Sequence, residues 1–138
     1  MAKAELKNSD VRVCSVIGFP LGAMSTKAKV EETKQALNDG ADEIDMVLNN
    51  GLLKSNDFDA VLKDIQAVKS QMPNNVLKVI LETCYLNEED ITKASTLAIK
   101  AGADFIKTST GFGTDGATIK DVKLMKNTIG NGTTKIKA

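Results

Sequence analysis

The sequence predicts a parallel β/α fold, in which short buried strands alternate with longer amphipathic helices. The strand-like runs are continuously apolar, which is typical of strands covered on both faces. The sequence also repeats itself: G-A-D-x-I followed by a charged residue occurs at 40–45 and again at 102–107. The two copies lie 62 positions apart, about the length of two β/α units.

The first half of the pattern begins with a strand at 11–19, followed by the loop PLGAMS. A helix is expected over 26–39, and Gly40 is a suitable residue to end it. The next strand is expected at 43–49. The apolar positions of the first helix are Ala28, Val30, Ala36 and Leu37.

The middle of the chain predicts one long helix and one strand. Ser55 or Asn56 can cap a helix that runs to about Gln71. One face of this helix is apolar. The third strand is expected at 76–84.

The last part contains two further helices, each with a capping signal. Asn87, with an aspartate three residues on, resembles a capping box and predicts a helix to Gly102. A strand follows at 103–110. Thr118 is expected to cap a helix to about Thr128, and a fifth strand begins at 134–138.

Length and composition indicate a single β/α domain over 1–138. Eighteen basic and eighteen acidic side chains cancel, so no charge excess favours nucleic acid or an anionic membrane. No apolar stretch is long enough for a membrane span or an export signal, which favours a cytoplasmic location. Cys14 and Cys84 are expected to be reduced core residues. Because the chain has no histidine and no Cys-x-x-Cys motif, neither a metal site nor a disulfide is expected. The missing histidine also excludes a Ser-His-Asp or Cys-His mechanism.

Charged residues recur near the ends of the expected strands. The repeat puts Asp45 and Lys107 at the same height on strands two steps apart, and Lys137 has a comparable place in the fifth strand. Residue alternation sends Lys78 and Glu82 to one face of the third strand. In a β/α barrel these five side chains would project inward near the carboxyl ends of the strands, where active sites of barrels lie.

This set of residues suits amine chemistry. Burial and a second lysine both lower the pKa of an amine and make Lys107 a nucleophile. A carboxylate such as Asp45 can relay protons through water. Two structural alternatives remain open: a lysine that reaches solvent at a strand end, and a buried ion-pair network that only fixes packing.

Four segments together resemble one family: VCSVIGFPLG, GADEIDMVLNNG, LKVILETCYL and GADFIKTSTGFGTDGAT. The chain resembles the deoxyribose-phosphate aldolases, class I aldolases with a (β/α)8 TIM barrel, in order along essentially its whole length. The resemblance implies that Lys107 is the Schiff-base lysine and Asp45 the proton-relay carboxylate. It implies that Lys137 is the second lysine, which lowers the pKa of the first.

The reaction implied by the resemblance is reversible cleavage of 2-deoxy-D-ribose 5-phosphate to acetaldehyde and D-glyceraldehyde 3-phosphate, without metal or organic cofactor. The partners are then a small aldehyde and a phosphosugar. Side chains and backbone N–H groups of the TSTG loop suit an anion or a carbinolamine oxygen. The residues expected to bind substrate are Thr108, Ser109, Thr110, Gly111, Lys78 and Glu82.

The resemblance covers only about strands three to seven of the barrel, and five strands cannot close an eight-stranded barrel. We therefore expect a homo-oligomer, a complementing fragment, or an open sheet with helices on both sides, and not a closed monomeric barrel. Phe112 brings no charge to the place where a phosphate would need one. A non-catalytic β/α fragment that self-assembles is the alternative to an active lyase.

Overall fold

The computed structural model describes residues 1–138, and its elements alternate between helix and strand from β1 onward. The strands are β1 (Cys14–Ile17), β2 (Glu43–Val47), β3 (Val76–Ile80), β4 (Phe105–Lys107) and β5 (Lys135–Lys137). The helices are α1 (Ala2–Glu5), α2 (Thr26–Asn38), α3 (Asn50–Lys54), α4 (Phe58–Ser70), the 3-10 turn η1 (Thr83–Tyr85), α5 (Glu88–Lys100) and α6 (Ile119–Ile129).

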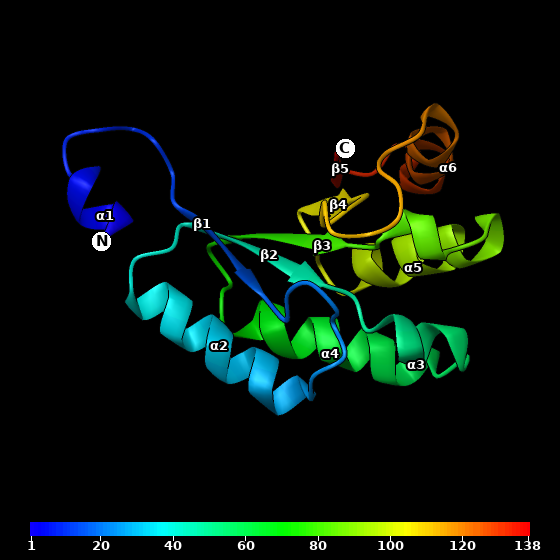
Figure 1. The fold of residues 1–138 in the computed structure, drawn as a ribbon, viewed down its shortest axis with the longest axis horizontal. Helices are drawn as coiled ribbons and strands as arrows, with labels where there is room; N and C mark the ends of the chain where they lie inside the picture. Colours follow the sequence, from blue (N-terminus) through cyan, green and yellow to red (C-terminus); the bar gives the residue numbers. More distant parts are fainter.

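All five strands form one open parallel sheet in the order β1-β2-β3-β4-β5. Helices α2, α4 and α5 lie together along one face of this sheet, and α6 continues the layer beside β4 and β5 (Figure 1). The opposite, concave face has no helix over it (Figure 1). The predicted parallel β/α architecture is confirmed. The alternative of helices on both sides is wrong, because each crossover returns on the same side of the sheet.

The hydrophobic core lies between the sheet and this helix layer. Alternate strand residues point into it, and they are fully buried: Ile17, Ile44, Met46, Leu77, Val79 and Ile106. The helices contribute their apolar stripes, led by Val61, Ile65 and Val68 of α4. The other strand residues, including Asp45 and Lys107, therefore point to the concave face.

The repeated G-A-D segments form two equivalent junctions between helix and strand. Gly40 and Gly102 have φ values of 94° and 89°, a conformation that glycine adopts without strain. At the first junction the N–H groups of Gly40 and Ala41 bond the carbonyls of Leu37 and Ala36, a Schellman motif, and the second repeats it. The repeat is therefore a structural device at the amino ends of β2 and β4.

Several boundaries differ from the sequence prediction. The cap of α4 is Asp57, whose side chain accepts from the N–H of Ala60, and not Ser55 or Asn56. Asn56 has a φ of 61° and lies between the unpredicted helix α3 and helix α4, so the two helices are not continuous. The capping box of Asn87 is confirmed, and so is the Thr118 cap of α6.

Neither cysteine is a core residue, in contrast to the prediction. Cys14 is exposed because its position in β1 points to the concave face. Strand β3 ends at Ile80, so the half-buried Cys84 lies in η1 and not in a strand. Both thiols are free, as predicted.

Helix α2 buries polar residues where the sequence predicted an apolar face. Lys29 and Thr33 are fully buried, whereas Ala28 and Val30 are only partly covered. The Lys29 Nζ lies 2.6 Å from Asp64 Oδ2 of α4 and donates to the carbonyl of Val47 at 3.0 Å. A charge partner on the neighbouring helix makes this burial possible, and the sequence of α2 alone does not reveal that partner.

Candidate active site

Asp45 lies at the centre of a group of charged side chains on the concave face. Its carboxylate is almost completely buried, and its two oxygens have different partners. Oδ1 accepts from Lys78 Nζ at 2.9 Å and from the Cys14 thiol at 3.1 Å. Oδ2 faces Lys137 Nζ at 3.2 Å and Lys107 Nζ at 3.8 Å.

Four of the five side chains predicted to meet on this face therefore do so: Asp45, Lys78, Lys107 and Lys137. In the strand ladder Asp45 pairs with Lys78 and Lys78 with Phe105, so Lys107 is two positions further along. Strands of a β/α barrel are tilted with a shear of about one residue per strand, which offsets this shift. In the ladder itself Asp45 is level with Phe105 and not with Lys107, so the predicted equal height would hold only along the axis of a barrel with this shear.

Lys107 has an environment that favours the neutral amine. Burial lowers its pKa, the nearby Asp45 carboxylate opposes this, and the positive charge of Lys137 lowers it again; the net shift is downward. Its Nζ donates to the carbonyl of Ser109 at 2.7 Å. A lysine with a lowered pKa beside a carboxylate can act as a nucleophile.

Lys78 has the opposite character. Burial alone would lower its pKa, but hydrogen bonds to Asp45 and Glu43 outweigh burial and raise the pKa well above its ordinary value. The Glu43 contact, 2.5 Å long, was not anticipated from the sequence. Lys78 therefore stays an ammonium ion, with both carboxylates holding it in place.

The groups around the Lys78 ammonium, two carboxylates and one thiol, have shifted pKa values. Burial works to raise the pKa of Asp45, but its bonds from Lys78 and Cys14 lower it overall. The Lys78 bond likewise lowers the pKa of Glu43. Partial burial of the sulfur raises the pKa of the Cys14 thiol, and the hydrogen bond to Asp45 adds to the effect, so the thiol stays protonated and donates a hydrogen bond to Asp45 Oδ1. Cys14 was predicted as a core residue. Residue alternation along β1 is the one sequence signal that could have placed it on the concave face with Asp45.

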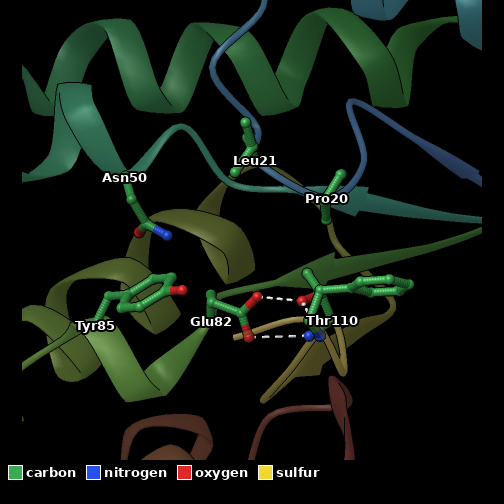
Figure 2. A pocket seen from close by; sticks show the side chains of 7 residues that line it. Pro20, Leu21, Asn50, Glu82, Tyr85 and Thr110 are labelled. Atoms are coloured by element: carbon green, nitrogen blue, oxygen red, sulfur yellow. Dashed lines mark hydrogen bonds between the residues drawn. The ribbon is translucent and has the colours of Figure 1, made fainter. Parts of the chain in front are cut away.

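Glu82 does not join this cluster. It follows the end of β3 in a left-handed conformation, so strand alternation no longer describes where it points. Its carboxylate accepts from the N–H and the hydroxyl of Thr110, as the dashed lines in Figure 2 show. Both residues line a small pocket of about 90 Å³, together with Pro20, Leu21, Asn50, Tyr85 and Phe112.

The residues after Lys107 form the loop at the carboxyl end of β4. Thr108 is fully buried, and its side chain points away from the concave face by strand alternation. The hydroxyls of Thr108 and Ser109 have no hydrogen-bond partner within the protein. Gly111 has a φ of 88° and open space beside it.

Two further features of the described chain bear on ligands. No group of three or more cysteine, aspartate and glutamate side chains is arranged to hold a metal ion. None of the helices has the length and apolarity to cross a membrane.

Comparison with known proteins assigns the chain to a family. The family model of the DeoC/LacD family aldolases matches residues 2–137. The chain belongs to this aldolase family. A deoxyribose-phosphate aldolase of Finegoldia magna is 59% identical over 94% of the chain. The resemblance noted in the sequence is thereby confirmed.

Solved structures of the family support the fold. A crystal structure from Coccidioides immitis superposes with a TM-score of 0.97 at 42% identity, over 99% of the chain and 55% of that protein. A tetrameric deoxyribose phosphate aldolase of Aeropyrum pernix gives a TM-score of 0.87 at 30% identity, over 99% of the chain and 57% of that protein. The five strands are thus part of a TIM-barrel fold. The chain spans about 60% of the length of the curated relatives that it matches, 61% in the case of Finegoldia magna.

Proposed function

We propose that this chain carries the Schiff-base site of a class I aldolase, with Lys107 as the nucleophile. Asp45 is the proton-relay carboxylate, and Lys137 is the second lysine. The observation that supports this best is the convergence of both lysines on one oxygen of Asp45, within 3.2 and 3.8 Å. Ammonium groups this close disfavour each other's charge, which is what a nucleophilic amine requires.

The chemistry follows from these positions. The neutral amine of Lys107 attacks the carbonyl carbon of an aldehyde donor. The carbonyl oxygen takes a proton from Lys137, and a carbinolamine forms. Loss of water from the carbinolamine leaves an iminium ion, which makes the adjacent C–H bond acidic. Asp45, acting through water, accepts that proton and gives the enamine. The enamine carbon then forms a bond to the carbonyl carbon of the acceptor aldehyde, and water releases the product and restores Lys107.

The proposed reaction is reversible cleavage of 2-deoxy-D-ribose 5-phosphate to acetaldehyde and D-glyceraldehyde 3-phosphate. The name carried by the curated relatives supports this choice of substrates. Thr108, Ser109, Thr110 and Gly111 lie next to the nucleophile and are proposed to shape the substrate side of the loop. Action in the cytoplasm on these small substrates is part of the same proposal.

The open sheet bears on how such a site would work. Strands β1 and β5 each have one neighbour, and the concave face that carries Asp45 has no covering layer (Figure 1). We propose that further β/α units cover this face in the active assembly, from a second copy or a complementing fragment. The tetrameric relative of Aeropyrum pernix is consistent with assembly in this family.

Borohydride trapping with acetaldehyde tests the nucleophile. Intact-mass measurement and peptide mapping should find a two-carbon adduct on Lys107, and Lys107→Ala should abolish it. Lys135→Ala is the matched control, because Lys135 lies on β5 beside the cluster without contacting Asp45. The control should keep the adduct.

The opposite result is also clear. Adducts spread over surface lysines, or none at all, would show that Lys107 is not activated. The chain would then be a non-catalytic β/α fragment, and its charged cluster would serve packing only.

A further inference from the structure

Glu82 combines burial, charge and an unusual backbone conformation. Glu82 is 3% exposed to solvent, and its backbone φ and ψ are 57° and 63°. A non-glycine residue in this left-handed region is strained, and such residues concentrate at functional sites. A buried carboxylate also needs partners that compensate for lost hydration.

Those partners belong to the loop that follows the nucleophile strand. The Thr110 N–H donates to Glu82 Oε1 at 3.0 Å, and the Thr110 hydroxyl donates to Oε2. The same hydroxyl oxygen accepts from the N–H of Phe112 at 3.0 Å. A side chain at Gly113 would lie 3.2 Å from Glu82 Cδ and 2.6 Å from Cys84 Sγ, so the loop approaches as closely as a glycine allows.

The anchored loop is in direct contact with the nucleophile. The Ser109 carbonyl, which accepts from Lys107 Nζ at 2.7 Å, immediately precedes Thr110. Fixing Thr110 therefore also fixes the direction of the carbonyl that holds the amine. The Ser109 side chain adds no restraint of its own, because its hydroxyl has no partner within the protein.

We propose that Glu82 is a positioning residue that fastens the loop 109–113 and so orients Lys107 through the Ser109 carbonyl. This replaces the substrate-binding role expected from the sequence, since both carboxylate oxygens are occupied by Thr110. The inference rests on the proposed function of Lys107.

The negative charge of Glu82 also bears on the pKa of Lys107. The charged and titratable groups around Lys107 are Asp45 of β2, Lys137 of β5, Glu82 after β3 and Cys14 of β1. Glu82 is among those that raise the pKa of Lys107, against the burial that lowers it. Removing this charge while keeping one acceptor oxygen for the Thr110 N–H should therefore lower the pKa of Lys107 further.

Two substitutions separate anchoring from charge. Glu82→Gln keeps an oxygen for Thr110 and removes the charge, whereas Glu82→Ala removes both. Glu88→Gln is the control, because it deletes a carboxylate that pairs only with exposed Lys120. Three quantities are measured on the full chain: amide exchange of Thr110 and Phe112, the Lys107 pKa by NMR of labelled lysine, and the rate of borohydride trapping with acetaldehyde.

We expect Glu82→Ala to speed exchange of both amides and slow trapping, each on the order of tenfold, the size expected for a hydrogen bond to a charged acceptor. Glu82→Gln should leave exchange near the original rate, lower the Lys107 pKa and move the trapping profile to lower pH. The control should change none of these.

Unchanged exchange in Glu82→Ala would overturn the proposal. So would a Glu82→Gln protein that loses trapping while its loop order and Lys107 pKa are unchanged, because Glu82 would then contact the substrate. If the original chain traps no aldehyde, the proposed function fails, and amide exchange with lysine titration still decides whether Glu82 positions Lys107.

Discussion

At the scale of single residues, the two oxygens of Asp45 have separate tasks. Lys78 and the Cys14 thiol hold Oδ1, so the carboxylate cannot rotate freely. Oδ2 remains for the two lysines of the proposed reaction. An active-site carboxylate needs both a fixed orientation and an available oxygen, and this division provides both.

Asp45→Asn should separate imine formation from proton transfer. The asparagine cannot accept a proton, so deuterium exchange at the methyl group of acetaldehyde should fall by about 10²–10⁴-fold. Asp45 raises the pKa of Lys107, so its neutralisation should lower that pKa and keep Lys107 able to form an imine. Exchange is followed by NMR in D₂O, and trapping by mass. Equal exchange in both proteins would contradict the relay role.

Lys78 should control how stability depends on pH. Asp45 and Glu43 have folded pKa values below their ordinary values of 3.8 and 4.5. Their ion pairs therefore stabilise the fold fully above these values, and the contribution is lost as pH falls through the lower folded values. The raised pKa of Lys78 has the opposite sign: its contribution is complete below 10.5 and lost as pH rises further.

Lys78→Met should accordingly lower the free energy of unfolding at pH 7 by about 3 kcal/mol, the lower end for breaking a buried pair. The difference between the two proteins should shrink as pH falls below the ordinary carboxyl values of 3.8 and 4.5 and through the lower folded values. Urea unfolding across this range measures it. Lys34→Met, which breaks an exposed pair with Glu31, should have little effect at any pH. A difference that does not change with pH would mean that Lys78 acts through packing alone.

At the scale of elements, much of the fold was predictable because its signals are local. Apolar runs, the Asn87 capping box and the G-A-D repeat each depend on neighbouring residues, and the structure has all three. Alternation along β2 and β4 likewise placed Asp45 and Lys107 on one face. The prediction misplaced Glu82 because β3 ends at Ile80 and the backbone of Glu82 is left-handed. Residue alternation applies only within a strand, so it could not predict this turn.

The Lys29–Asp64 pair was not predictable for a different reason. A lysine in an amphipathic helix normally faces solvent, and its burial depends on a partner 35 residues away. The Lys29 side chain also packs closely against the loop before α2, since a Cβ at Gly18 would lie 3.1 Å from Lys29 Cε. A buried ion pair therefore joins helix α2 to helix α4, at a position where most helices make apolar contacts.

Lys29→Met should destabilise the fold by about 3–5 kcal/mol, because it leaves the Asp64 carboxylate buried without its cation. The double variant Lys29→Met, Asp64→Asn should recover most of this loss, since asparagine can still accept from Thr26. Urea unfolding of the two proteins, with Asp64→Asn alone as a third, gives the coupling energy. Additive losses would show that the two residues do not act as a pair.

At the scale of the whole molecule, the sheet has two open edges. Parallel strands at an edge present unpaired N–H and C=O groups, which favour pairing with another chain. The concave face adds apolar surface next to one edge: Val16 of β1 is 44% exposed. In a TIM barrel this face is the interior, so covering it would complete both the core and the surroundings of Lys107.

We therefore expect the chain to associate through this face. Light scattering should give a mass above one chain at tens of micromolar protein, falling towards one chain on dilution. Val16→Glu should weaken association at least about tenfold, because a charge at a covered position must lose its hydration. Leu21→Glu is the matched control: Leu21 is also exposed, but it lies in the loop before α2 and off the sheet.

A mass of one chain at every concentration would contradict association, and it would mean that Asp45 and Lys107 must work on a face open to water. Activity measured on the same fractions would then show whether the site needs the covered face at all: trapping that rises with mass links assembly to chemistry, and trapping independent of mass separates them.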